Sequence, residues 1–503
     1  MEDLYGKIVE LAKRRGLFWP AYEMYGGVKG FMCFGPLGSE LKRKIEDKWR
    51  EWFVRRQGFV EIEAPVIAPE AVFEASGHVE HFKDWMVRCL KCGRFFKADR
   101  VVEEATGIQS ADKFGGEYLR KLIVERDVRC PECGGELSEP SRTLTMFETS
   151  IGPYSEAKAY GRPEAAQGMF TEFRRVYMAT GEKLPLGIAQ VGKALRNEIS
   201  PRKGVLRLRE FTIMEVEVFF DPEDPGCDRF KEVEDDVVKL LTADMQREGL
   251  TEPVEKTLGE ALSEGLIMAE WQAYFMGVAK RFLNYLGVPD ERQRFREHLP
   301  DERAHYSTQT FDQEVLLSRW GWVEVSGHAY RTDYDLKAHM EHSGQDLRVF
   351  KEGRRFIPHV VEPSFGSERL MYVALEYAYR EKDGRIVLSL PRDLAPISVA
   401  VLPLVERDGL PEKALEVYDM LMEEGFTVGY ESKGSIGRRY ARFDEIGTPV
   451  AVTVDYRTLE DDTVTLRDRD SWRQVRQSIA TLPELLRKYL NYCMEFDELG
   501  EPV

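Results

Sequence analysis

The sequence predicts an α+β protein in which a large domain, built on an antiparallel sheet flanked by helices, precedes a smaller mixed α/β domain. Three observations support this fold class. The chain has 503 residues, too many for one compact core. Between residues 187 and 220, two strand-like segments flank a loop at 200–204 that contains proline and glycine, as in an antiparallel hairpin. From residue 397 onward, strand and helix patterns alternate.

Composition places the chain among ordinary globular proteins. Hydrophobic residues make up 43% and charged residues 32% of the sequence, and no apolar run approaches the roughly 20 residues that span a bilayer. The first residues are charged and amphipathic, without the pattern of a secretory signal, so we expect a cytoplasmic protein with no membrane partner. The formal net charge of −17 means that any nucleic acid must meet local basic patches.

The large domain is expected over residues 1–390. A helix is predicted at 39–57 from the apolar stripe Leu41, Ile45, Trp49 and Phe53, followed by a strand at 59–62. Two insertions are expected in this domain, one resembling a zinc ribbon at 86–140 and an acidic, helical one at 221–301, which includes a helical patch at 230–246.

The smaller domain is expected over residues 391–503. We predict strands at 397–404, 427–431, 449–456 and 463–467, helices at 411–424 and 438–446, and a final helix from about residue 471. Four basic residues lie in and just before its second helix, namely Lys433, Arg438, Arg439 and Arg442. Such a charge run is usually a solvated face, and nucleic-acid binding is the alternative.

Four of the seven cysteines form two pairs, Cys89 with Cys92 and Cys130 with Cys133. This spacing is typical of a zinc ribbon, and four thiolates suit a structural tetrahedral Zn²⁺ ion with no open position for catalysis. Buried free thiols and disulfides are the alternatives, and a reducing cytoplasm disfavours disulfides.

The hairpin strands carry chemically active side chains on one face. Strand alternation places Arg196 beside Glu198, and places Phe211 between basic and acidic residues that include Glu215. These groups could hold a phosphate, an amine and a stacked purine. Salt-bridge ladders on a solvated sheet face would give the same pattern and are the more common explanation.

A second cluster is a strand at 359–366 that leads through Gly366 into a helix, with Arg369 in the first helical turn. Free amides at a helix N-terminus, together with an arginine, suit a nucleotide phosphate. Glu164 and Glu324 are further carboxylates among apolar or small residues, where each alone is more often a surface group.

Together these segments resemble the three signature motifs of class II aminoacyl-tRNA synthetases, at 58–65, 196–211 and 366–369. Their sequences closely resemble those of the dimeric glycyl-tRNA synthetases. That family also shares the short sequence motifs found here at 25–27, 35–38, 76–78, 162–164, 331–333 and 362–364. The last domain resembles the anticodon-binding domain of the glycyl, histidyl, prolyl and threonyl enzymes. Two positions depart from the family pattern, Ala165 and Lys97, where relatives often have Thr and Arg.

The resemblance implies a homodimeric ligase that activates glycine with ATP and Mg²⁺ and then charges tRNA(Gly), releasing AMP and pyrophosphate. Arg196, Glu198 and Arg369 are the implied catalytic residues. The implied glycine ligands are Lys97, Glu164, Glu215, Glu362 and Ser364. ATP would contact Arg196, Asn197, Glu198, Leu206, Arg209, Glu210, Phe211, Glu324, Val325, Gly366 and Arg369. The basic patch becomes an expected tRNA contact, whereas zinc is not implied, because the cysteine pairs occur in only some relatives.

Three rival functions are a class II synthetase for another amino acid such as proline or threonine, a non-catalytic relative that kept the fold, and a zinc-ribbon nucleic-acid-binding scaffold. The pocket carboxylates oppose the first. Arg196, Glu198, Phe211 and Arg369 oppose the second, and the third would leave the motif set without a purpose.

Overall fold

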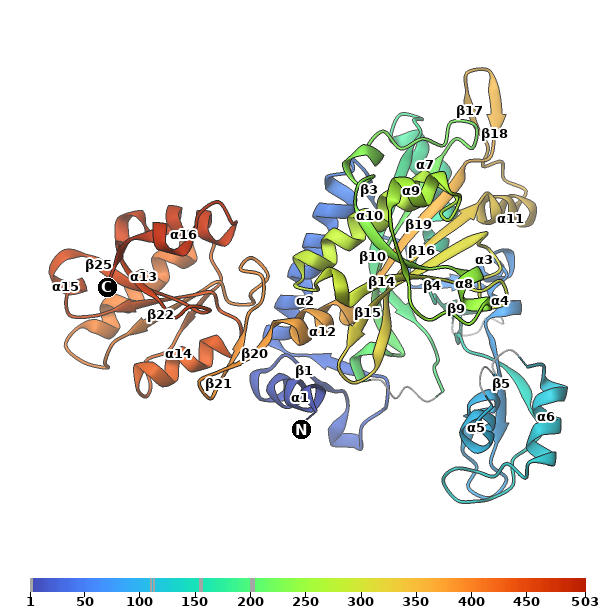
Figure 1. Cartoon of the computed structure of the whole chain (residues 1–503), viewed down its shortest axis with the longest axis horizontal. Coiled ribbons are helices and arrows are strands. Elements are labelled where there is room, and N and C mark those ends of the chain that lie inside the picture. Colours follow the sequence, from blue (N-terminus) through green and yellow to red (C-terminus); the bar gives the residue numbers. More distant parts are fainter. Residues whose placement is uncertain (1–2, 109–110, 112–113, 153–156, 200–203) are drawn as a thin grey trace.

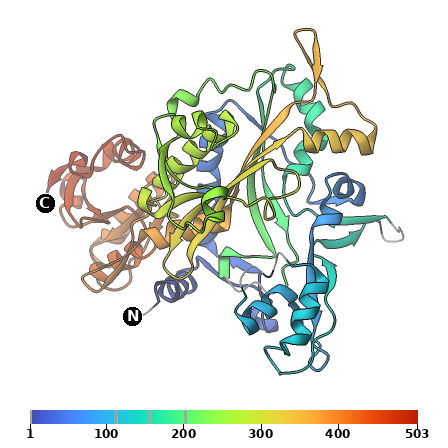
Figure 2. The same cartoon turned by 45° about the vertical axis from the view of Figure 1, so that its right-hand side comes forward.

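The computed structural model describes residues 3–108, 111, 114–152, 157–199 and 204–503. The predicted hairpin loop therefore lies, at residues 200–203, outside the described residues. Within the described ranges no helix is long and apolar enough to cross a membrane. Figure 1 shows a large central body, a C-terminal domain in red on one side and a small blue-green insertion projecting on the other, and the turned view in Figure 2 agrees.

A nine-stranded sheet forms the centre of the large body, and its strands are antiparallel except for the pairs β12–β14 and β3–β10. The order across the sheet is β13 (Val254–Thr257), β12 (Val237–Leu241), β14 (Gln293–Glu297), β15 (Gln309–Leu317), β16 (Gly321–Thr332), β19 (His359–Gly366), β11 (Glu210–Phe220), β10 (Leu186–Leu195), β3 (Val60–Glu61). The predicted antiparallel hairpin is the β10–β11 pair, whose register matches Ala194 with Phe211.

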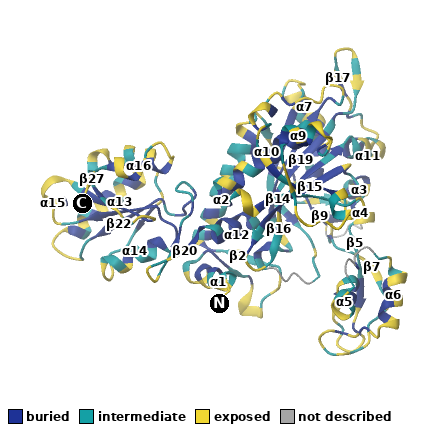
Figure 3. Ribbon diagram, in the orientation of Figure 1, coloured by how far each residue is buried: buried dark blue, intermediate teal, exposed yellow. Residues whose placement is uncertain are grey.

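Side-chain alternation along β11 divides the sheet into two faces. Met214, Val216 and Val218 point into the main hydrophobic core, which also contains Leu41 and Trp49. The helices that cover this face are α1 (Leu4–Arg15), α2 (Pro36–Arg50), α10 (Glu270–Tyr285) and α12 (Ser367–Ala378). The opposite face packs partly against α7 (Ala166–Ala179) and α11 (Tyr334–Ser343), and its remainder is free to form a site. Figure 3 shows the sheet as the most deeply buried layer.

Helix α2 begins three residues before the predicted start, at Pro36 after the extended Gly35, and a wider helical turn over Glu51–Arg55 continues it. Proline at the first helical position explains this start, since its missing amide is not needed there. Gly38 lets the helix pack against the backbone, because a β-carbon there would lie 1.7 Å from the Leu17 carbonyl oxygen.

The expectation of a helical insertion at 221–301 is only partly met. Residues 230–246 are not a helix, because a strand, β12, occupies their centre and pairs with β13 and β14. The β-branched Val237 and Val238 favour a strand, and pairing at the sheet edge decides between two patterns that short apolar runs leave ambiguous. The helices of this segment are α8 (Ala243–Arg247), α9 (Leu258–Ser263) and the long α10.

The cysteine-containing insertion has its own small core. The described part of the insertion consists of β5 (Lys83–Arg88), β6 (Phe95–Lys97), β7 (Ser141–Leu144), α5 (Ala98–Thr106) and α6 (Gly116–Glu125). Its core contains the buried residues Val87, Phe96 and Leu119. Two helices and three strands make this unit larger than a bare zinc ribbon.

The second core begins at Val399, near the predicted boundary after residue 390. Its sheet is mixed, as expected, with parallel β23 (Val428–Tyr430), β22 (Val399–Pro403) and β24 (Val450–Val454) followed by antiparallel β25 (Thr463–Asp468), β26 (Gln474–Ser478) and β27 (Glu501–Pro502). The helix expected from about residue 471 is wrong at its start, because β26 pairs with β25 first. Helix α16 runs over Leu482–Leu490.

The basic patch lies on and before α14 (Ile436–Asp444). Lys433 and Arg438 are exposed, and Arg442 is paired with Glu431. Arg439 is 1% exposed and donates hydrogen bonds to the carbonyl oxygens of Pro403, Glu431 and Leu404. The expectation that Arg439 contacts tRNA is therefore wrong, because amphipathic spacing turns this one arginine of the run inward.

Arg439→Ala should lower the free energy of unfolding by about 3 kcal/mol, because it leaves buried carbonyl oxygens without donors. The matched control Arg438→Ala removes the neighbouring exposed arginine and should cost less than about 0.5 kcal/mol. Urea denaturation of both full-length variants measures the difference, and equal losses would contradict the structural role of Arg439.

Candidate functional site

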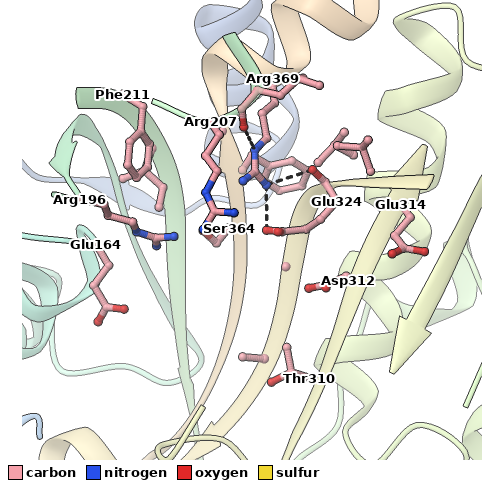
Figure 4. A pocket seen from close by; sticks show the side chains of 18 of the residues that line it. Glu164, Arg196, Arg207, Phe211, Thr310, Asp312, Glu314, Glu324, Ser364 and Arg369 are labelled. Carbon is pink, nitrogen blue, oxygen red and sulfur yellow. Dashed lines mark hydrogen bonds and ion pairs between the residues drawn. The ribbon is translucent and has the colours of Figure 1, made fainter. Parts of the chain in front are cut away.

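A cavity of about 580 Å³ opens on the free face of the central sheet. Strands β11 and β19, the start of α12, and Arg196 and Glu198 after the end of β10 provide one side, and β14, β15 and β16 provide the other. Figure 4 shows Glu164, Arg196 and Phe211 on one wall and Glu324, Asp312 and Glu314 opposite. Of the residues predicted for the site, the cavity is lined by Glu164, Arg196, Glu198, Leu206, Phe211, Glu215, Glu324, Val325, Glu362, Ser364, Gly366 and Arg369.

The other four predicted residues do not line this cavity. The Asn197 backbone amide donates a hydrogen bond to the Thr145 carbonyl oxygen. The Arg209 side chain donates to the carbonyl oxygens of Lys29 and Glu198. Both residues therefore stabilise the local backbone. Glu210 lies 3.6 Å from the Lys193 ammonium. Lys97, in the insertion, pairs with Asp84 at 2.5 Å and lines a smaller hollow beside Glu198 and Arg207.

Arginines gather at the upper end of the cavity. The Arg196 guanidinium lies 5.2 Å from the centre of the Phe211 ring and donates from Nε to the Pro163 carbonyl at 3.1 Å. Arg369 donates to the Leu206 carbonyl and forms a 3.0 Å ion pair with Glu324. Arg207 pairs with Glu198 at 2.9 Å. Guanidinium groups beside an aromatic ring have the chemistry that suits a nucleotide and its phosphates.

Carboxylates occupy the opposite wall, which we call the acidic wall and define as Asp312, Glu314 and Glu324. Sequence reasoning assigned a role to Glu324 alone. Burial raises the pKa of Asp312, and the charge of Glu324 adds to the effect. Arg296 contacts Asp312 at 3.1 Å and Glu314 at 3.3 Å. The period-two pattern of polar residues along β15, at Thr310, Asp312 and Glu314, could have identified this wall, since these side chains share one face.

The floor of the cavity holds buried carboxyl groups around a single guanidinium, that of Arg331, which is 0% exposed. It donates two hydrogen bonds to Asp335 at 2.7 and 2.9 Å, one to Glu362 at 2.7 Å and one to Glu164 at 3.4 Å. The Tyr306 ring covers it at 3.7 Å. With Glu215 and Glu217, these carboxyl groups form what we call the carboxylate cluster, namely Glu164, Glu215, Glu217, Glu362 and Asp335.

The members of the carboxylate cluster differ in their ionisation. Burial acts against the charge of Glu164, but His78 and Arg331 hold its pKa below the usual range. Burial raises the pKa of Glu215 to about 8, and the charges of Glu362 and Glu164 add to the effect. Glu215 accepts hydrogen bonds from the Ser364 hydroxyl at 2.9 Å and from the Ala165 amide at 2.7 Å. The floor is therefore suited to a small cation.

Sequence reasoning recognised the phrase at 331–333 but assigned Arg331 no role. An arginine at the end of a strand pattern carries no clear signal of burial, because two of its partners, Glu362 and Glu164, come from distant segments, and Asp335, four residues away, lies on the next helix. Only the paired, buried setting distinguishes it from a surface residue.

Arg331→Met should lower the free energy of unfolding by about 3–5 kcal/mol, since it leaves several buried carboxylates without their cation. Arg175→Met serves as the control, because the Arg175 side chain on α7 is 87% exposed. Urea denaturation compares the two, and a loss below about 1 kcal/mol for Arg331→Met would contradict the pairing as described.

Comparison with known proteins gives the family of this chain. Residues 155–378 match the family described as tRNA synthetase class II core domain (G, H, P, S and T), and residues 398–489 match the anticodon binding domain. The chain is 49% identical to a glycine–tRNA ligase of Aeropyrum pernix, with 100% of this chain and 99% of the relative covered. It is 44% and 40% identical to the glycine–tRNA ligases of Pyrococcus furiosus and Methanocaldococcus jannaschii, each over 97% of this chain and 99% of the relative. The chain therefore belongs to the glycine–tRNA ligase family of class II aminoacyl-tRNA synthetases.

Proposed function

We propose that this protein activates glycine with ATP to form enzyme-bound glycyl-adenylate and pyrophosphate, and then transfers glycine to the 3′-terminal adenosine of tRNA(Gly). One observation carries the proposal. A single cavity combines arginines and an aromatic ring at one end with buried carboxylates at the other. Such a site can hold the phosphates of a nucleotide beside the ammonium of an amino acid, so that the two reacting groups meet in between.

Arg196 and Arg369 would bind the phosphates of ATP, and Phe211 would stack on its adenine. Arg196 directly follows the end of β10 and lines the cavity, where it would stabilise the charge that develops on the α-phosphate as the glycine carboxylate attacks. Its contact with the Pro163 carbonyl limits its rotamers and so orients it in advance. Glu198, paired with Arg207, would complete this end of the site.

Glu164, Glu215, Glu362 and Ser364 would bind the glycine ammonium. The remaining floor around them is formed by short residues such as Gly327 and Ala329. A site built of carboxylates and small residues offers no apolar room for a side chain, so the smallest amino acid fits best.

Metal ions belong to the proposal as well. Mg²⁺ would bind beside Glu324, whose carboxylate would help to hold it, and the ion would neutralise charge on the pyrophosphate. Asp312 and Glu314 are paired with Arg296 in this structure. The four free cysteines Cys89, Cys92, Cys130 and Cys133 have sulfur atoms within 4.8 Å of one another. Two Sγ–Sγ distances are 3.5 and 3.8 Å, close to the roughly 3.8 Å expected between tetrahedral zinc ligands.

We further propose that the protein works in the cytoplasm as a homodimer and that Lys433, Arg438 and Arg442 contact tRNA. Lys433 and Arg438 are exposed in a chain that is otherwise acidic. The match of residues 398–489 to the anticodon binding domain supports a tRNA contact on this part of the chain.

Amino-acid-dependent exchange of pyrophosphate into ATP tests the activation step. We expect exchange with glycine and not with alanine, serine, proline or threonine, and we expect Arg196→Ala to lower it by about 10²–10³-fold, as for other groups that stabilise transition-state charge. Arg175→Ala, a change of one exposed arginine, is the control and should retain full exchange. Exchange with another amino acid would reassign the substrate, and no exchange at all would favour a non-catalytic protein.

The charging step is tested separately by aminoacylation of tRNA(Gly). If Lys433 and Arg438 contact tRNA, their double alanine variant should raise the KM for tRNA and leave glycine-dependent exchange unchanged. Equal loss of both activities would instead indicate a damaged fold.

Metal analysis of protein purified without added metal should find about one zinc ion per chain. Cys130→Ser should lose the zinc and the order of the insertion, because Cys130 is buried in its core, whereas Cys33→Ser alters an exposed cysteine outside the cluster and should keep it. A wild-type protein without zinc that remains fully folded would contradict the proposed structural zinc.

A further inference from the structure

The carboxylate cluster contains more acid than its surroundings can neutralise, and this inference rests on the proposed binding of glycine to the members that line the cavity, Glu164, Glu215 and Glu362. Its five carboxyl groups meet two buried guanidinium groups, that of Arg331, which pairs with three of them, and that of Arg162. His78 adds at most one further charge, at 3.5 Å from Glu164. Five ionised carboxylates would leave at least two uncompensated charges in a buried site, which is strongly unfavourable. The empty cluster must therefore hold protons.

Glu217 identifies one of these protonated groups. Its side chain is 0% exposed, and within the described part of the chain neither carboxyl oxygen has a hydrogen-bond partner. It lies on β11, opposite Ile188 of β10. Arg331 is already bonded to Asp335, Glu362 and Glu164. Burial and the charge of Glu362 raise the pKa of Glu217 well above its usual range, so Glu217 is a neutral acid.

Glu215 differs from Glu217 although both lie on the same face of β11. It lines the cavity, whereas Glu217 does not, and its two oxygens accept hydrogen bonds from Ser364 and from the Ala165 amide. These donors stabilise an ionised Glu215 but leave it among other acids. Glu164, Glu215 and Glu362 all line the cavity and would meet an incoming ammonium. Glu164 and Glu362 are paired with Arg331, whereas among the described residues Glu215 has no ion pair, so Glu215 is the member that would carry a proton when the pocket is empty.

Every element packed around Glu215 contributes to its electrostatic surroundings. β11 contributes Glu217, β19 contributes Glu362 and β16 contributes Arg331. The remaining charged or titratable groups are Glu164 before α7, Asp335 and His339 on α11, His78 on α4 (His78–His81), and Tyr306 and Arg162 from loops. Arg331 and Arg162 are the permanent cations of this set. In the set as a whole the carboxyl groups outnumber these two cations.

We propose that the pocket takes up glycine by exchanging a proton for the ammonium charge, with Glu215 releasing the proton while Glu217 remains protonated. The O–H bond of the Glu215 carboxyl breaks, its proton leaves to solvent, and the resulting carboxylate pairs with the ammonium. One positive charge enters as another leaves, so the buried cluster keeps its net charge. The site can therefore bind a cation without holding an uncompensated carboxylate when empty.

The exchange has a defined pH dependence. Glu215, with a pKa of about 8 in the empty pocket, is protonated at pH 7, and an ammonium within contact distance lowers the pKa of a carboxyl group by about 1–3. Glycine affinity is then highest above pH 8. As the pH falls below 8 the affinity drops by about tenfold per pH unit, until the pKa of the complex is reached.

Calorimetric titration of the full-length protein with glycine tests the proposal, in buffers of equal pH but different ionisation enthalpy. The dependence of the observed enthalpy on the buffer gives the number of protons released. We expect about 0.4–0.9 of a proton at pH 7, depending on how far the ammonium lowers the pKa of Glu215, and about 0.1 or less at pH 9. Glycine binding without proton release at pH 7 would overturn the inference.

Two variants identify the acid. Glu217→Gln keeps the shape and neutrality of Glu217, so the proton count and the KM for glycine in the exchange assay should both remain unchanged. Ser364→Ala removes a donor to ionised Glu215, so its KM should begin to rise at a higher pH than in the wild type. Loss of proton release in Glu217→Gln would assign the proton to Glu217 and overturn the role of Glu215.

The experiments distinguish failure of proton exchange from failure of the proposed function. A wild type that exchanges pyrophosphate with glycine but releases no proton retains the proposed function and rejects proton exchange. A folded wild type that neither binds glycine nor supports exchange rejects the proposed function, and this inference with it.

Discussion

The pairing of Arg331 with buried carboxylates is the interaction on which the substrate cavity depends. It joins β16 to β19 through Glu362, to α11 through Asp335 and to the loop before α7 through Glu164. A buried ion network of this kind contributes little net stability, because each charge must first lose its hydration. The network instead fixes geometry, because removing any partner leaves an unpaired charge buried in the low-dielectric interior. The three segments are thereby held together, and two of them, through Glu164 and Glu362, line the cavity.

The parts of the site that could be predicted from sequence lie on one hairpin and one strand–helix junction. Alternation along β11 places Phe211 and Glu215 toward the same space, Arg196 joins them directly after the end of β10, and the position of Arg369 follows from the first turn of α12. Local periodicity is sufficient there, because neighbouring strands are also neighbours in the chain. The family resemblance then supplied the roles that spacing alone left open between a site and a salt-bridge ladder.

The errors have a common physical origin in long-range contact. Residues 230–246 carry apolar spacing that suits a helix or a strand, and only pairing with β13 and β14 makes their centre a strand. In the sequence Arg439 is one member of a basic run, but in the fold it is buried and donates hydrogen bonds to three backbone carbonyl oxygens outside its helix. The acidic wall and the burial of Arg331 were missed for the same reason, since both depend on partners that are distant in the sequence, such as Arg296 for the wall and Glu164 and Glu362 for Arg331. Composition reveals charge, but only the fold reveals which charges are buried.

In the proposed function, the distribution of charge in the cavity explains how an acidic protein could handle anionic substrates. Arg196 and Arg369 line one part of it, where they would offset the repulsion of a polyanion by a chain of net charge −17. The acidic wall lies opposite and is itself paired with Arg369 and Arg296, whereas the carboxylate cluster at the floor holds acids in excess of its cations. A bound amino acid would then point its carboxylate toward the arginines and its ammonium toward the floor. Orientation of the reacting carboxylate would thus be a consequence of where the fold buries its charges, before any contact specific to the transition state is made.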